Sequence, residues 1–288
     1  MAAPFFDIEE SELTSLRDKV ILITGCSSGI GLATVKLCLN AGAKVVGGDV
    51  NPCPHSSDSL IYARVDVTDW KSQAALFKKA IEAHGRVDHI FANAGIAIVD
   101  NFVTDVLDSD GELQPPNLRC LDVNLTGVIY SCKLGIHWLR KNPEGGSVVI
   151  TGSASSFLPF FLTDYGVSKH AVLGLMRGLN ENLVETKIRV NCITPHWTAT
   201  GLAPKEVIQD KLGITMQGPE AVAKSAMWLM AGETRKGQTI YSMRGRYREM
   251  DQVLLGAALQ TMETTKEDGP EDPLAMKKML EGLPAHTA

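Results

Sequence analysis

A short apolar run followed directly by a glycine-rich loop restricts the fold of this chain more than any other feature of its sequence. The run is Val20-Ile21-Leu22-Ile23, and the loop continues as Thr24-Gly25-Cys26-Ser27-Ser28-Gly29-Ile30-Gly31. A strand that passes through such a loop into a helix presents free backbone N–H groups and the positive end of the helix dipole, which together suit a pyrophosphate. The residues expected to form this phosphate site are Gly25, Ser27, Ser28, Gly29, Ile30 and Gly31.

Each glycine of the loop has its own task in this interpretation. Gly25 permits the sharp turn, Gly29 lets a pyrophosphate approach the backbone, and Gly31 permits close contact between helix and strand. A glycine triplet alone is weak support for a dinucleotide site, but here it follows a strand pattern and opens a helical pattern that continues to about Asn40. The loop therefore predicts a dinucleotide-binding site.

Asp49 stands at the end of the second β-branched run, where the ribose of a bound dinucleotide would lie. A carboxylate there accepts hydrogen bonds from both ribose hydroxyls and repels a 2′-phosphate. The sequence therefore predicts NAD rather than NADP. The alternative, a solvated turn residue before Asn51-Pro52, fits the spacing less well.

Short β-branched runs alternate along the chain with longer helical patterns, and its hydrophobic content of 44% over 288 residues is enough for one large core. The runs are Lys19–Ile23, Lys44–Gly48, Ile61–Val65, His89–Ala92, Ser147–Thr151 and Arg189–Ile193. The alternation predicts an α/β fold, a single doubly wound Rossmann-type domain with a parallel sheet of about seven strands.

This domain is expected over residues 19–255, with a substrate lid at about 198–218. Residues 1–18 are then an N-terminal extension, and residues 256–288 a C-terminal tail. Two stretches, Asp100–Pro116 and Glu263–Ala288, have the composition of a long loop and of a charged tail.

The ends of the third and fourth runs carry further candidate cofactor residues. These are Asp66 and Val67 after the third run, and Asn93, Ala94 and Gly95 after the fourth. Because ligands gather at the carboxyl ends of the strands in open α/β sheets, we expect these residues beside the adenosine. Alone, Asp66 would more often cap a helix with Thr68, and Asn93 would be an ordinary turn former.

Tyr165 and Lys169 are the candidate proton-transfer pair. Their spacing of four residues places both on one helix face, where the ammonium can lower the phenol pKa from its unperturbed value of about 10. Ser153 follows the fifth run and precedes Tyr165 by twelve residues, so that its hydroxyl can converge with the phenol.

In this order the glycine loop, Asn93-Ala94-Gly95, Asn124, Ser153 and the Tyr165/Lys169 pair resemble the short-chain dehydrogenase/reductase family over roughly residues 19–245. The resemblance implies that Tyr165 is the general base in oxidation and the acid in reduction. It implies that Lys169 lowers the phenol pKa and binds the nicotinamide ribose, and that Ser153 hydrogen-bonds the substrate oxygen. Asn124 would hold a water that relays protons to Lys169; by itself it could instead be a buried polar residue that bends a helix.

The segment from Asn191 to Thr200 resembles the part of the family that closes over the nicotinamide. The resemblance places Pro195, Trp197, Thr198 and Thr200 at the cofactor, with Thr198 or Thr200 on the carboxamide. His196 stands where the family usually has glycine, which leaves the local backbone path open. A bystander histidine is the favoured interpretation of His196.

An apolar stretch, Ala154–Leu162, follows Ser153 and predicts the wall of a hydrophobic substrate pocket. With Trp197 and Leu202 it could enclose a ring-bearing secondary alcohol or ketone; its phenylalanines could equally form a subunit interface. The chain is similar to NAD-dependent secondary-alcohol dehydrogenases of the hydroxyprostaglandin-dehydrogenase-like kind, including enzymes that tailor fungal polyketides or terpenoids. A non-redox use of bound NAD(H), in cyclisation or sensing, is the alternative.

Charge and composition weigh against other classes of protein. The net charge of −5 with no basic block argues against nucleic acid, and no apolar stretch approaches the roughly 18 residues that span a bilayer, so we expect a cytoplasmic protein. Six cysteines without a CxxC pair predict neither a metal site nor disulfides. The helical patterns around 118–139 and 164–185 are apolar on more than one side, which predicts a homodimer or homotetramer.

Overall fold

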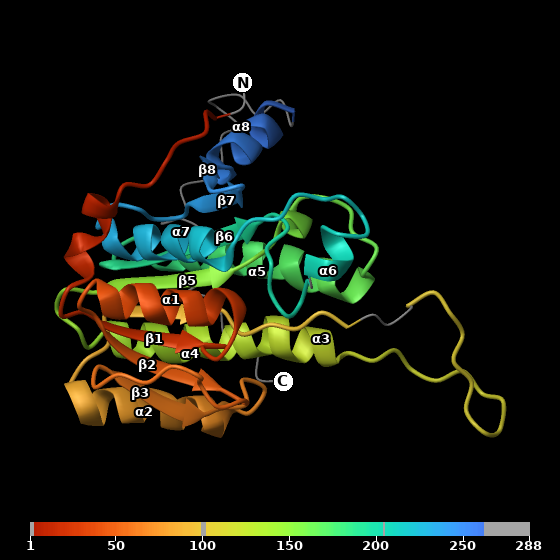
Figure 1. Ribbon diagram of the computed structural model, residues 1–288, viewed down its shortest axis with the longest axis horizontal. Helices are drawn as coiled ribbons and strands as arrows, with labels where there is room; N and C mark the ends of the chain where they lie inside the picture. The colour runs from red at the N-terminus through yellow and green to blue at the C-terminus, as the bar shows by residue number, and fades with distance from the viewer. Residues whose placement is uncertain (1–2, 99–101, 204, 262–288) are drawn as a thin grey trace, which may run out of the picture.

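The computed structural model describes residues 3–98, 102–203 and 205–261, apart from the side chains of residues 207 and 259–261. Within these residues eight strands form one sheet in the order β3-β2-β1-β4-β5-β6-β7-β8 (Figure 1). Their bounds are β1 Val20–Thr24, β2 Lys44–Asp49, β3 Leu60–Arg64, β4 His89–Ala92, β5 Gly146–Thr151, β6 Ile188–Pro195, β7 Thr239–Met243 and β8 Arg246–Glu249. Neighbouring strands are parallel from β3 to β7, which confirms the predicted doubly wound fold.

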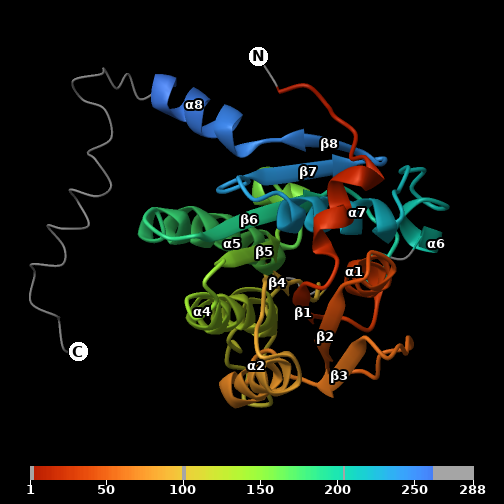
Figure 2. The same ribbon diagram turned by 90° about the vertical axis from the view of Figure 1, so that its left-hand side faces the viewer.

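Helices cover both faces of the sheet (Figure 2). One face carries α1 (Gly29–Asn40), α7 (Pro219–Ala231) and the 3-10 helix η1 (Glu10–Leu16), and the other carries α2 (Trp70–His84), α4 (Gly127–Leu139) and α5 (Thr163–Asn182). Shorter elements are α3 (Arg119–Leu121), the π-helical turn η2 (Asp122–Thr126), the 3-10 turn η3 (Ala154–Ser156), α6 (Lys205–Ile208) and α8 (Asp251–Thr261).

Alternation along β1 explains why the sheet separates two cores. Val20 and Leu22 pack into the core beneath α2, α4 and α5, whereas Ile21 and Ile23 pack into the core beneath α1 and α7. Successive side chains of a strand point to opposite faces, and a strand buried on both faces is apolar throughout. The continuous apolar run thus places β1 in the middle of the sheet, with its carboxyl end and the glycine loop at the edge where ligands bind.

Residues 3–18 pack against the sheet and α7. Leu13 and Leu16 are buried in the core on that side, and the Glu12 carboxylate accepts a hydrogen bond of 2.8 Å from Nε1 of Trp228. Phe6 forms an antiparallel bridge to Tyr247 of β8, with two backbone hydrogen bonds of 2.8 and 3.0 Å.

The predicted loop at Asp100–Pro116 is irregular over its described part, residues 102–116, except for a bridge between Leu107 and Leu113. In Figure 1 this yellow segment extends away from the sheet. Residues 99–101 and the predicted tail Glu263–Ala288 lie outside the described residues. Across the described chain, every helix is too short or too polar to cross a membrane.

Candidate active site

The glycine loop is a tight turn held by Asn93 at the end of β4. Gly25 has a φ of +70°, and a Cβ there would lie 2.8 Å from Cα of Ala94. A Cβ on Gly31 would overlap the carbonyl oxygen of Gly25. The Asn93 side-chain amide donates to the carbonyl oxygens of Thr24 and Gly25 at 3.2 and 3.3 Å. Asn93 therefore holds the glycine loop in place through these two hydrogen bonds, and it also lines the cavity.

A cavity of about 1060 Å³ runs along the carboxyl ends of the strands. All but three of the predicted catalytic and cofactor-binding residues line this cavity. The lining ones are Gly25, Ser28, Gly29, Ile30, Asp49, Asp66, Val67, Asn93, Ala94, Gly95, Ser153, Tyr165, Lys169, Pro195, Trp197, Thr198 and Thr200. The exceptions are Ser27, Gly31 and Asn124, which lie behind the cavity wall. The Ser27 hydroxyl donates to the carbonyl oxygen of Asn51 at 2.7 Å and ties the loop to the segment after β2, while its role at the cofactor stays a prediction.

Asp49 lies at the cavity wall with its carboxylate held by backbone groups. Its two oxygens accept hydrogen bonds from the N–H groups of Ser27 at 3.0 Å and Asn51 at 2.9 Å. Each carboxylate oxygen keeps a lone pair for another donor, as two ribose hydroxyls require. The side chain is therefore fixed in position and still able to bind.

The sequence identified Asp49 as the charged residue at this end of the site, but the structure adds two arginines. Nε of Arg64, at the end of β3, lies 3.4 Å from the carbonyl oxygen of Val50, and Arg119 lines the cavity. Nearby Asp66 accepts hydrogen bonds from the backbone and hydroxyl of Thr68, which hold the pKa of its carboxyl below the usual range. No sequence motif marks these arginines. The fold, and not a local pattern, brings them to this edge of the sheet.

Lys169 is buried beside Tyr165 on α5. Its Nζ donates a hydrogen bond of 2.8 Å to the carbonyl oxygen of Thr151 and lies 5.5 Å from the centroid of the Tyr165 ring. Burial lowers the pKa of Lys169 to about 8. The lysine therefore loses its proton near the upper end of the physiological pH range.

The expected lowering of the phenol pKa by Lys169 is wrong for this structure. Burial raises the pKa of Tyr165, while a hydrogen bond with Ser153 acts in the opposite direction. Desolvation disfavours the phenolate, and a lysine at this distance from the ring does not reverse the effect. Burial therefore favours the neutral phenol, which is the form that acts as the acid in reduction.

Ser153 begins the turn η3 at the end of β5, where its Oγ accepts a hydrogen bond from the N–H of Ser155 at 3.2 Å. This cap fixes the hydroxyl on the cavity wall near the phenol of Tyr165. Ser156, which sequence reasoning missed, donates from its hydroxyl to the carbonyl oxygen of Lys169 at 2.7 Å and joins η3 to α5. The turn and the helix thereby hold the Ser153, Tyr165 and Lys169 side chains in one place.

Asn124 is fully buried in the π-helical turn that precedes α4. Its amide bridges to Ile96, accepting from the backbone N–H at 2.8 Å and donating to the carbonyl oxygen at 2.9 Å. Nδ2 also donates to Oγ of Ser168 at 3.2 Å. This geometry fits the helix-bending interpretation; the proton-relay role implied by the family resemblance stays a prediction.

The two threonines predicted to contact the carboxamide differ in availability. The Thr198 hydroxyl donates to the carbonyl oxygen of His196 at 2.8 Å and accepts from Nε2 of Gln217 at 3.3 Å. Thr200 has no such bonds among the described residues, and its Cγ2 would lie 3.0 Å from a Cβ on Gly29. The segment after β6 thus reaches back to the glycine loop, with Thr200 free to bind.

Aromatic side chains line the cavity beyond Tyr165. The Phe160 ring lies 5.7 Å from that of Tyr165 and 6.1 Å from that of Trp197, measured between centroids. The Phe161 ring lies 4.7 Å from that of Phe160 between centroids, tilted by 45°, and Phe161 is 77% exposed. The predicted apolar wall is therefore present and remains open toward solvent.

These features fit a bound dinucleotide. The N-terminal N–H groups of α1 receive no side-chain cap, the glycines clear space in front of them, and Asp49 faces the same cavity. At the other end of the cavity, a reacting oxygen can accept or donate hydrogen bonds with Ser153, Tyr165 and Lys169. Fold and site together define a dinucleotide-dependent oxidoreductase.

The chain belongs to the short-chain dehydrogenase family, because the sequence model described as short chain dehydrogenase matches residues 19–211. It is 41% identical over 283 residues to Short-chain dehydrogenase/reductase ascJ from Acremonium egyptiacum, a match that covers 96% of this chain and 95% of that protein. It is 32% identical over 231 residues to 5'-hydroxyaverantin dehydrogenase from Dothistroma septosporum, covering 71% and 76% of the two chains.

Among solved structures, the fold is similar to 3-ketoacyl-(acyl-carrier-protein) reductase from Brucella melitensis complexed with NADH. The TM-score is 0.69 at 24% identity, and the match covers 80% of this chain and 98% of that one. The protein is thus an oxidoreductase of a family that uses nicotinamide cofactors.

Proposed function

We propose that this protein transfers hydride between NAD and a neutral, apolar secondary alcohol or ketone. The observation that carries the proposal is one continuous cavity with Asp49 at its ribose end and Ser153, Tyr165 and Lys169 at its reacting end. The aromatic wall around Phe160 and Trp197 supports an apolar, ring-bearing substrate. The dehydrogenase relative from Dothistroma septosporum supports a CH–OH substrate.

The bound nicotinamide supplies the hydride acceptor or donor, and side chains of this chain handle the proton. In oxidation, Tyr165 acts as the tyrosinate, and its Oη takes the proton from the alcohol oxygen as the C–H bond breaks. Ser153 donates a hydrogen bond to that oxygen and stabilises the charge that develops on it. Lys169 would hold the ribose of the bound cofactor. In reduction, Tyr165 returns the proton to the new alkoxide.

A non-redox use of bound NAD(H) is disfavoured, because the three catalytic side chains converge on the same wall of the cavity. The test follows the near-ultraviolet absorbance of the reduced cofactor with a panel of cyclic secondary alcohols and their ketones. We expect substrate-dependent change with NAD and a much smaller rate with NADP. Binding of NADH without hydride transfer to any ketone of the panel would contradict the proposal. The expected cytoplasmic location stays a prediction.

A further inference from the structure

His196 occupies the position that is glycine in the family resemblance, yet its backbone does not need glycine. Its φ is not positive, unlike those of Arg244 and Gly245 in the adjacent turn, and its N–H donates to the carbonyl oxygen of Ser242 at 2.9 Å. A side chain is therefore accommodated here without strain. The imidazole has to be explained by its surroundings and not by the path of the backbone.

The surroundings leave the ring able to bind. His196 is half-buried and lines the same cavity as Tyr165 and Trp197, and its ring meets that of Tyr241 edge-on at 6.1 Å. Within the described chain, neither ring nitrogen has a hydrogen-bond partner, and neither is sealed from solvent. Both nitrogens are therefore open to the cavity, where a bound molecule can reach them.

The charge state of the ring narrows the ligand. Burial and the Arg244 guanidinium lower the pKa of His196 from its ordinary value. At neutral pH the imidazole is therefore uncharged and offers one N–H donor and one lone pair. Such a group recognises a carbonyl or a hydroxyl, whereas a carboxylate or phosphate would select a cation.

We propose that His196 is a specificity residue that hydrogen-bonds a second oxygen of the substrate, a carbonyl or hydroxyl other than the one that reacts. This inference rests on the proposed function and narrows the substrate class to oxygenated apolar ring compounds. In this arrangement Tyr165 and Ser153 bind the reacting oxygen of the substrate. Phe160 and Trp197 contact the substrate ring, and His196 hydrogen-bonds the additional oxygen.

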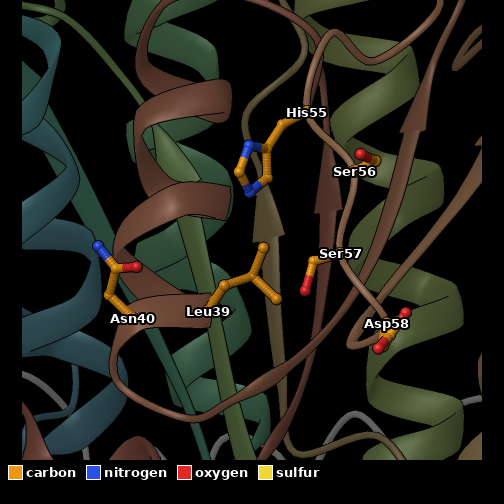
Figure 3. Close-up of a pocket in the computed structure, with 6 residues that line it drawn as sticks. All are labelled: Leu39, Asn40, His55, Ser56, Ser57 and Asp58. Carbon is orange, nitrogen blue, oxygen red and sulfur yellow. The ribbon is translucent and has the colours of Figure 1, made fainter.

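The test uses the intact protein with NADH. The probes are α-tetralone, its hydroxylated derivatives, and the methyl derivatives substituted at the same positions. We measure kcat/KM for reduction, and affinity for the enzyme–NADH complex by calorimetry, for wild type, His196→Phe and His196→Gln. Phenylalanine keeps the ring and removes both nitrogens, whereas glutamine keeps a donor and an acceptor. His55→Phe is the control, because His55 lies in a separate open depression beside Leu39 and Asn40 at the end of α1 (Figure 3).

We expect wild type to prefer at least one hydroxylated derivative over its methyl counterpart by about tenfold in kcat/KM, as one hydrogen bond in a pocket provides. His196→Phe should abolish this preference without weakening NADH binding, His196→Gln should restore part of it, and the control should match wild type. Equal losses on hydroxylated and methyl probes, or a wild type without preference, would overturn the role of His196 while leaving the proposed function standing. Failure to bind or reduce any tetralone would instead count against the proposed substrate class and against this inference with it.

Discussion

At the scale of single residues, burial decides the acid–base chemistry of this site. Lys169 is buried and Tyr165 is half-buried, and this desolvation raises the pKa of the phenol and lowers that of the ammonium to about 8. Each shift disfavours the charged form of its group. The sequence predicted the identity and helical spacing of this pair, but not the desolvation that shifts both pKa values.

Replacing Tyr165 by phenylalanine tests the proton-transfer role. The ring contact with Phe160 at 5.7 Å should persist, because only the hydroxyl is lost. We expect kcat to fall by more than about a hundredfold with little change in NADH affinity, since general acid–base catalysis commonly contributes that much. Steady-state kinetics and fluorescence titration of NADH measure the two effects. Tyr130→Phe, on α4 against Trp70, is the matched control; a Tyr165 variant that keeps a tenth of the rate would refute the assignment.

The pKa of about 8 for Lys169 predicts pH-dependent cofactor binding. The lysine is protonated below this pKa, so its charge supports binding of the anionic dinucleotide there and is lost as the pH rises through about 8. We expect the dissociation constant of NADH, measured by fluorescence, to increase above that pH. Lys169→Met should bind more weakly and show a flatter profile. Equal pH dependence in the variant would assign the effect to another group.

At the scale of elements, strand register explains what the sequence left out. The six predicted strands are found with ends shifted by at most two residues, whereas β7 and β8 were missed. The strand β8 is Arg246–Glu249, and its charged side chains hide the β pattern. Its antiparallel return depends on the turn at Arg244 and Gly245, both with positive φ. Local composition therefore predicted the six strands from β3 to β6 in the sheet order and missed the two at the β8 edge, although β7 is largely buried.

Register also sets the test of cofactor choice. Asp49 of β2 pairs with Arg64 of β3, so the carboxylate that should exclude a 2′-phosphate has an arginine on the neighbouring strand. Because Asp49 lines the cavity and Arg64, which does not line it, donates to the carbonyl oxygen of Val50, we expect wild type to prefer NAD by about a hundredfold in kcat/KM. Asp49→Ser combined with Val50→Arg should narrow or reverse this ratio. Equal use of NADP by wild type would mean that Arg64 and not Asp49 governs the site.

At the scale of the whole molecule, we propose that α4 and α5 form a subunit interface. Val167 and Ile129 on their outer faces are 51% and 40% exposed, and nothing lies within 4 Å of a Cβ placed on Gly166, Gly174 or Gly178. Small residues at helical spacing let a second helix approach closely. The predicted surplus of apolar surface on these helices is only partly present. The exposed glycines of α5 are the second reason to place the interface here.

Gly174→Trp tests this proposal, because the monomer has room for the side chain and a packed helix pair does not. We expect light scattering to give wild type a mass that is a multiple of 31.1 kDa. The variant should dissociate to single chains at protein concentrations at least about tenfold higher than those at which wild type dissociates. Lys79→Trp, on the exposed face of α2, should behave as wild type. A wild-type mass of one chain at micromolar concentration would remove the proposal.

The bridge between Phe6 and Tyr247 bears on solubility. Strand β8 ends the sheet, and a bare edge strand presents unpaired N–H and C=O groups that can template association with another chain. The two backbone hydrogen bonds from Phe6 occupy part of that edge. Removing the residues before Ile8 should therefore favour edge-to-edge aggregation during storage or heating, visible as rising turbidity while the absorbance-monitored reaction of the remaining soluble enzyme is unchanged.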